Sequence, residues 1–307
     1  MRATRTTKLL AAALLTAQAC YAGAGAEPLD FLFLDADARA VGMGGAYTAL
    51  ATDANALLYN PAGLGRIEHV ETTFMHNEYF QGVTQDYAAI AFPRGWGANV
   101  NYLRFGDVPR TTIDQPDGTG ENATLTDAAL GLGYGRTLFH GFSVGLGAKW
   151  VRETIAGVSA TVLAFDAGAL YDVPRIERFT LGMSVQNMGH AVRYQHADEN
   201  LPLNVRMGAA YGFALAKQEN TVSLDITKER SEGPIVALGA ETIVAKVLPV
   251  RFGYCTRNDA GQGIAVGIGW LYGGNRMDYA FEPFGDLGSA HRLSVTWRWG
   301  GEEAIPE

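Results

Sequence analysis

The stretch His291–Trp299 reads HRLSVTWRW. Its apolar and polar residues alternate strictly, so Leu293, Val295, Trp297 and Trp299 share one face. A period of two places successive side chains on opposite faces of a β-strand. This stretch therefore predicts a strand with one apolar face and one polar face.

The same alternation recurs from about residue 66 to residue 300. We count about fourteen such segments, and each is near the ~10 residues that a tilted membrane-spanning strand needs. They lie near 67–76, 84–92, 96–105, 124–138, 142–152, 160–172, 179–188, 204–214, 220–228, 234–242, 248–256, 262–271, 276–283 and 290–299. The pattern predicts an all-β chain.

Two features favour a membrane barrel over a soluble β-sandwich, which also alternates. Aromatic residues end the apolar faces, as Phe142 and Trp150 do in FSVGLGAKW. The connections alternate between tight turns and long polar loops, such as 106–123 and 189–203. Aromatic girdles, short periplasmic turns and longer outer loops are typical of outer-membrane barrels. We predict a transmembrane antiparallel β-barrel of about 14 strands, with both chain termini in the periplasm.

The N-terminus predicts export. Three basic residues precede the apolar run LLAAALLTA, and Ala24–Gly25–Ala26 matches a signal-peptidase site. Lipidation of Cys20 is the alternative processing. We divide the chain into a signal peptide (1–26), an N-terminal hatch segment (27–65), the barrel (66–300) and a periplasmic C-terminal tail (301–307).

Composition narrows the class further. After cleavage only Cys255 remains, so an internal disulfide is excluded. The net charge of −8 argues against nucleic-acid partners and anionic membrane surfaces. The polar strand faces consist mainly of Gly, Ala, Ser, Thr and Asn, and the chain has 38 Gly. A lumen lined by such small residues leaves room for another segment.

The stretch 43–64, MGGAYTALATDANALLYNPAGL, is a candidate for that segment. Gly44 and Gly45 allow positive φ or close approach of the backbone. Asp53 is a candidate N-cap for a short helix over ANALLY, and Pro61 ends that helix. An apolar, almost uncharged segment of this kind fits a plug inside a barrel.

These residues resemble a known family. Ala38–Ala46 (ARAVGMGGA), Asp53–Ala56 and Asn60–Leu64 (NPAGL) resemble the N-terminal signature of the FadL superfamily, in its PorV/PorQ-like (UPF0164-type) branch. The resemblance implies a fourteen-stranded barrel in the outer membrane of a Gram-negative-type bacterium. It also implies that Gly44, Gly45, Asp53, Asn60, Pro61 and Ala62 form the hatch and gate.

The resemblance implies two functions. FadL-type barrels move hydrophobic small molecules such as long-chain fatty acids across the outer membrane, and this is the first expectation. The alternatives are a PorV/PorQ-like component of type IX-like protein secretion that binds protein cargo, or a structural barrel. The expected partners are outer-membrane lipid, the barrel-assembly machinery during biogenesis, and a hydrophobic ligand or a secreted protein. The modest loops of this chain favour the PorV/PorQ-like branch, and Tyr79 and Phe80 are the candidate outer-loop contacts.

Charged residues on the polar faces have two interpretations. Arg206, Arg251, Arg292 and Arg298 could bind a carboxylate head group in the lumen. Alternatively they pair with acids, as Arg206 and Asp225 could on neighbouring strands. No spacing typical of a metal site and no nucleophile motif is present, so we expect no metal, no cofactor and no enzymatic activity.

Overall fold

The computed structural model describes residues 29–139, 141–193, 198–257 and 261–300. In this part of the chain, fourteen strands form a closed barrel with antiparallel pairing throughout. The predicted signal peptide and the predicted C-terminal tail lie outside the described residues. No helix among the described residues is long and apolar enough to cross a membrane.

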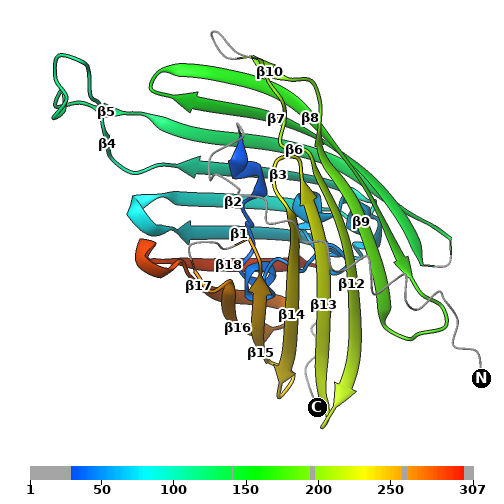
Figure 1. Cartoon of the computed structure of the whole chain (residues 1–307). Helices are drawn as coiled ribbons and strands as arrows, with labels where there is room; N and C mark the ends of the chain where they lie inside the picture. Colours follow the sequence, from blue (N-terminus) through cyan, green and yellow to red (C-terminus); the bar gives the residue numbers. More distant parts are fainter. Residues whose placement is uncertain (1–28, 140, 194–197, 258–260, 301–307) are drawn as a thin grey trace, which may run out of the picture.

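The barrel strands follow one another around the wall, and β1 closes the barrel against β18 (Figure 1). They are β1 (Val70–Glu78), β2 (Thr84–Ala91), β3 (Trp96–Arg104), β6 (Leu125–Phe139), β7 (Phe142–Ile155), β8 (Val158–Asp172), β9 (Phe179–Met188), β12 (Asn204–Leu215), β13 (Gln218–Glu229), β14 (Pro234–Val244), β15 (Leu248–Cys255), β16 (Ile264–Tyr272), β17 (Asn275–Pro283) and β18 (Ser289–Trp299). Every predicted segment is confirmed, with ends that differ by up to three residues.

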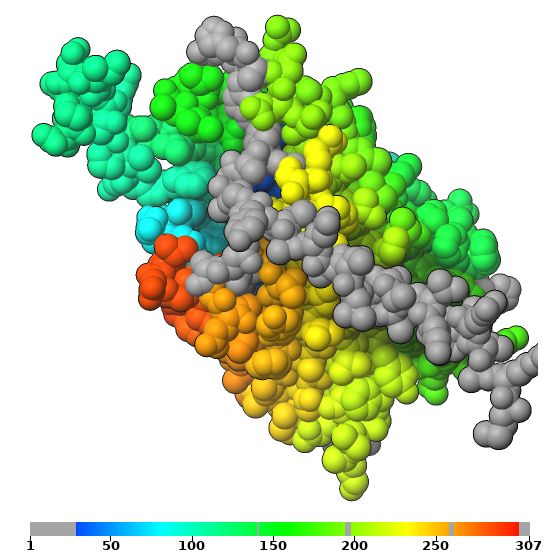
Figure 2. Space-filling model, in the orientation of Figure 1, coloured from blue at the N-terminus to red at the C-terminus, as the bar shows by residue number. Residues whose placement is uncertain are grey.

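Two short hairpins extend the long connections. β4 (Val108–Pro109) pairs with β5 (Asn122–Ala123), and β10 (Val192–Arg193) pairs with β11 (Asp198–Glu199). The hairpin that carries β4 and β5 projects from the body of the molecule (Figures 1 and 2). We call residues 107–122 the outer arm, because the long loops lie at the end that we assign to the cell exterior.

Each strand has one apolar face and one polar face, as the alternation predicts. Apolar side chains face outward and stay exposed, including Leu146 at 67%, Trp270 at 55% and Trp297 at 46%. In an antiparallel sheet with a buried inner face, this outer band would be unfavourable in water. A closed barrel in lipid satisfies its backbone hydrogen bonds and leaves no free edge.

The hatch fills the lumen with short helical turns. They are η1 (Asp30–Phe33), α2 (Ala38–Gly42), α3 (Ala56–Tyr59) and η2 (Pro61–Arg66), which are drawn in blue between the walls in Figure 1. Two more turns, η3 (Phe80–Gly82) and η4 (Gly285–Leu287), lie in outer loops. Helix α2 contacts β15 to β18, and η2 contacts β6 to β8, so the hatch bridges opposite walls.

The predicted placement of both termini in the periplasm falls outside the described residues, but the direction of the hatch follows from the residues that are described. Leu29 and Phe31 pack with Leu103, Val192 and Leu201, which lie at the outer end of the lumen. The described chain therefore starts at the outer end and runs through the lumen to β1, which begins at the periplasmic end. Strand parity places the ends of the barrel, but it cannot place a segment that passes through the lumen.

Candidate functional site

Inward-facing glycines let the hatch lie directly on the strand backbones. A Cβ at Gly145 would lie 2.2 Å from the carbonyl carbon of Pro61, and one at Gly253 would lie 2.0 Å from the amide nitrogen of Gly44. Similar close approaches occur at Gly97, Gly133, Gly135, Gly168, Gly182 and Gly239. The prediction that a glycine-lined lumen holds the N-terminal stretch is consistent with these contacts.

Asn60 joins the two halves of the hatch to the wall. Its Nδ2 donates to the carbonyl oxygens of Thr48 and Ala169, at 3.1 and 3.0 Å. Its Oδ1 accepts from the amide of Ala62 and so caps η2, which starts at Pro61. Asn60, Pro61 and Ala62 thus form one buried junction, and Pro61 follows the end of α3 as predicted.

Gly44 and Gly45 form the turn after α2. Their φ values are +65° and +79°, a region that glycine adopts without steric cost. A Cβ at Gly44 would lie 2.6 Å from the amide nitrogen of Tyr254. The carbonyl of Gly45 accepts a 2.8 Å hydrogen bond from Nη2 of Arg206. Both glycines therefore allow the turn and also leave space for neighbouring atoms that a Cβ would displace.

Asp53 does not cap α3 as expected. The helix starts at Ala56 with Asn55 as its N-cap, and the side chain of Asn55 makes no capping bond. Asp53 instead accepts from the amide of Asn55 at 3.0 Å and from the hydroxyl of Tyr47 at 2.6 Å. The physical reason is that buried donors surround the Asp53 carboxylate. It therefore closes a turn that precedes the helix.

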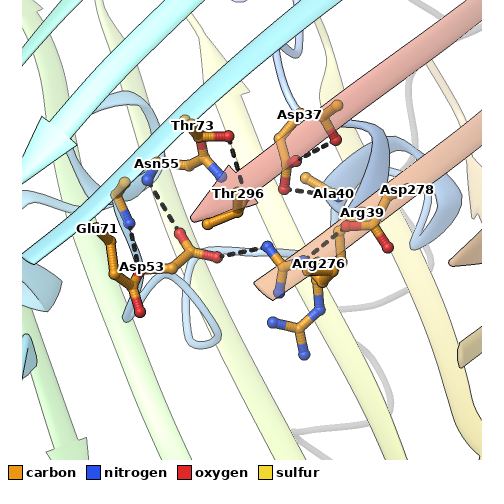
Figure 3. Close-up of polar contacts among 12 residues, drawn as sticks. Asp37, Arg39, Ala40, Asp53, Asn55, Glu71, Thr73, Arg276, Asp278 and Thr296 are labelled. Atoms are coloured by element: carbon orange, nitrogen blue, oxygen red, sulfur yellow. Dashed lines mark hydrogen bonds and ion pairs between the residues drawn. The ribbon is translucent and has the colours of Figure 1, made fainter. Parts of the chain in front are cut away.

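A continuous chain of ion pairs fixes α2 and Asp53 to the wall, and Figure 3 shows the part of it around Asp53, Arg276 and Asp278. Arg276 lies 3.3 Å from Asp53 and 2.6 Å from Asp278. Arg251 lies 2.7 Å from Asp278 and 2.5 Å from Glu241.

At the far end of this chain, Arg39 binds Glu241 through two nitrogens, at 3.0 and 2.7 Å. Three arginines alternate with three carboxylates, which compensates most of the cost of burying each charge. We call Asp53, Arg276, Asp278, Arg251, Glu241 and Arg39 the ion-pair chain.

Asp37 lies beside this chain without an arginine of its own. It caps α2 by accepting from the amide of Ala40, and it accepts from the hydroxyl of Ser294 at 3.2 Å. Burial raises the pKa of Asp37 to about 6, and the positive charge of Arg276 opposes that rise. Burial also raises the pKa of Tyr47, so this hydroxyl stays protonated and can donate to Asp53.

Each predicted lumenal arginine contacts an acid. Arg206 lies 3.7 Å from Asp225, Arg292 lies 2.9 Å from Glu282, and Arg298 lies 2.6 Å from Glu71. Arg251 belongs to the ion-pair chain. The structural interpretation from the sequence accounts for these contacts, and ligand binding by the four arginines stays a prediction.

The sequence did not predict four members of the ion-pair chain as site residues: Arg39, Glu241, Arg276 and Asp278. Arg39 lies inside the quoted family signature, and Asp278 alternates with apolar residues on a predicted strand. Their partners lie up to 223 residues apart in sequence. No spacing rule links positions that only the barrel register brings together.

Tyr79 and Phe80 lie at the outer end of the lumen. Their rings pack with that of Phe284 at 6.1 and 5.2 Å between centroids. The hydroxyl of Tyr79 accepts a 2.6 Å hydrogen bond from Nη2 of Arg292. The structure thus joins two predicted outer-loop contacts to one predicted lumenal arginine.

Two cavities flank the hatch in the described part of the chain. The larger is about 320 Å³, lies at the periplasmic end and is lined by arginines and carboxylates of the network. The smaller is about 80 Å³, lies at the outer end and includes Asp35, Cys255 and Arg257 in its lining. The buried hatch separates them.

The closed barrel, its apolar outer band and its filled lumen define an outer-membrane β-barrel protein of a Gram-negative-type bacterium. Residues 23–235 match a sequence model described as Type IX secretion system protein PorV. The chain belongs to this family. The description of this family names a component of type IX secretion and no enzymatic activity.

Solved structures share the fold at low sequence identity. The toluene transporter TodX of Pseudomonas putida is 12% identical with a TM-score of 0.55, covering 85% of this chain and 98% of that one. A FadL homologue of Pseudomonas aeruginosa is 12% identical with a TM-score of 0.53, covering 86% and 98%. The CymD monoaromatic hydrocarbon channel is 10% identical with a TM-score of 0.54, covering 85% and 96%. A comparison with curated protein sequences found no match.

Proposed function

We propose that this chain is an outer-membrane component of type IX-like protein secretion that binds a protein partner at its outer end. The observation that carries the proposal is the occupied lumen. The hatch bridges opposite walls, and the buried ion-pair chain fixes it there. A lumen filled in this way disfavours an open pore and leaves the outer surface of the barrel for contact with a partner.

The outer arm supplies a surface for such a partner. It projects from the barrel (Figure 2) and ends near Ile113, whose side chain is fully exposed. Backbone hydrogen bonds between Arg110 and both Glu121 and Thr119 hold its two sides together. A projecting hairpin with an exposed apolar side chain suits contact with a folded protein.

Native mass spectrometry of the mature protein, extracted from outer membranes in mild detergent, tests the proposal. We expect a stoichiometric protein partner and no bound apolar small molecule. A variant whose outer arm is replaced by a short Gly-Ser turn should lose the partner and remain a folded barrel. Retention of the partner by this variant would place the contact elsewhere, and absence of any partner would contradict the proposal.

Transport of hydrophobic small molecules is the second candidate. The apolar cluster at the outer end favours it, because Leu29 and Phe31 lie there among Leu103, Val151 and Leu201. The periplasmic cavity offers such a molecule only one apolar side, since arginines and carboxylates form most of the rest of its lining. A bound apolar mass that disappears when Asn60 and Pro61 are replaced would support transport. Movement of hydrophobic small molecules would then be the better supported function.

A further inference from the structure

The periplasmic cavity is built from both the hatch and the wall. Arg39 and Asp53 come from the hatch, and Glu71, Arg276 and Arg298 come from strand ends. Ile243, Pro249 and Leu271 form an apolar side of the same cavity, from β14, β15 and β16. The volume of about 320 Å³ is at the lower end of the range for small-molecule sites.

The acceptors that line this cavity already have donors. Glu71 accepts from Nε of Arg298 and from the amide of Ala54. Both oxygens of Glu241 accept from Arg39, and one also accepts from Arg251. The two oxygens of Asp53 are also occupied. The carboxylates therefore have little capacity left for a ligand.

The donors, by contrast, are in excess. Arg251 has a fully buried side chain that lines the cavity, and its Nη2 has no hydrogen-bond partner among the described residues. Arg298 uses Nε for Glu71, and its side chain is 47% exposed, so it remains accessible to a ligand. Arginine donors in a fork match a carboxylate through two parallel hydrogen bonds.

We propose that this cavity binds a single carboxylate on a short apolar stem, which enters from the periplasm. The carboxylate accepts from the spare arginine donors, and the stem packs on Leu271, Pro249 and Ile243. A dianion such as phosphate is disfavoured, because Asp53, Glu71 and Glu241 line the same space. A peptide C-terminus and a fatty acid both present this chemistry, and the test separates them.

Isothermal titration calorimetry on the full mature protein in detergent tests the proposal. The probes are N-acetyl-leucine and N-acetyl-leucinamide, which share one stem and differ in the carboxylate. We expect the amide to bind at least tenfold more weakly than the acid. Equal affinities, or no binding of the acid at millimolar concentration, would overturn the proposal.

Two variants assign the binding to the cavity. Arg298→Gln removes the half-exposed donor and should weaken N-acetyl-leucine binding by roughly tenfold, the effect of one lost charged hydrogen bond. Leu271→Ala should weaken N-acetyl-leucine but leave acetate unchanged. Arg175→Gln is the control, since Arg175 is an exposed arginine of the periplasmic turn between β8 and β9. An equal loss in the Arg175 variant would overturn the assignment.

Heat-dependent mobility in gel electrophoresis verifies that each variant remains a folded barrel. If Arg298→Gln fails this check, Arg298→Lys, which keeps the charge and loses the fork, replaces it and should still bind more weakly. Octanoate and N-acetyl-alanyl-leucine then compare the two sources of carboxylate. Because no protein partner enters these titrations, their failure is distinct from failure of the proposed function.

Discussion

At the residue scale, the smallest side chains fix the position of the hatch. The lumenal glycines do not serve flexibility, because they lie in regular strands. They leave space for the backbone of the hatch, and Gly145 and Gly147 show the difference two residues apart on the same face of β7. A Cβ at Gly145 would lie 2.2 Å from Pro61, whereas a Cβ at Gly147 would have no neighbour closer than 3.5 Å.

Gly145→Ala should therefore destabilise the hatch by about 1–3 kcal/mol, the usual cost of overpacking. Gly147→Ala should be nearly neutral. Hydrogen exchange followed by mass spectrometry over residues 56–66 measures both. Equal loss of protection in the two variants would contradict the argument from contact with Pro61.

Asp37 gives the hatch a dependence on pH. Its pKa in the folded protein, about 6, lies above the usual 3.8 because the carboxyl is buried. Ionisation of Asp37 therefore opposes folding, and the penalty is absent below pH 4 and complete above pH 6. Asp37→Asn keeps the α2 cap and should stabilise the protein by on the order of 3 kcal/mol at pH 8.

The stabilising effect of Asp37→Asn should shrink toward zero at pH 4. Urea unfolding of both proteins at pH 4 and pH 8 measures the difference in free energy of unfolding. A difference that does not change with pH would show that burial does not raise the pKa of Asp37 above its value in the unfolded chain.

At the scale of elements, α2 is too short to be stable by itself. A helix of five residues has little intrinsic stability, so tertiary contacts must hold it. Arg39 provides the polar part of these contacts through its paired hydrogen bonds to Glu241. Glu241 also binds Arg251, so the wall keeps one partner when the hatch partner is lost.

Arg39→Gln should lower the stability of the hatch by roughly 3 kcal/mol, at the low end for a broken buried ion pair. That loss corresponds to about a hundredfold faster exchange of backbone amides over residues 38–60. Arg110→Gln is the control, because the Arg110–Glu121 pair is exposed on both sides and such pairs contribute little. Similar exchange in the Arg39 variant and the wild type would exclude a fastening role for this pair.

At the scale of the whole molecule, the hatch separates two ends with different chemistry. The outer end carries the aromatic group of Tyr79, Phe80 and Phe284 and the outer arm. The periplasmic end carries the arginine-rich cavity. The barrel wall lies in lipid and the lumen is filled by the hatch. Partners and ligands in water can therefore reach the protein only at its two ends.

This arrangement predicts which residues each compartment can reach. Ile113→Cys should react with a membrane-impermeant maleimide on intact cells, because Ile113 lies in the outer arm. Thr52→Cys, at an exposed position next to Asp53, should react only after the periplasm is opened. The wild type, with Cys255 partly buried, is the control. Labelling of Thr52→Cys on intact cells would reverse our assignment of the two ends.

The alternation of apolar and polar residues determined the strands, their approximate number and the face that meets lipid, because a period of two depends only on local geometry. The stretch Asn60–Ala62 and the pair Gly44–Gly45 predicted a hatch from local turn and helix signals. The prediction of Asp53 as a helix N-cap was wrong, because its distant donors override a local capping preference. Helix and turn signals act within a few residues, so they could not include Tyr47 or Arg276.

The sequence by itself therefore determined a membrane barrel, and its N-terminal stretch predicted a plug. Only the tertiary structure decided that the hatch runs from the outer end to the periplasmic end, and that Arg39, Glu241, Arg251, Asp278, Arg276 and Asp53 form one chain of charges. The physical reason is range. Strand alternation is set by neighbouring residues, whereas the ion-pair chain depends on closure of the barrel, which brings together residues from opposite ends of the sequence.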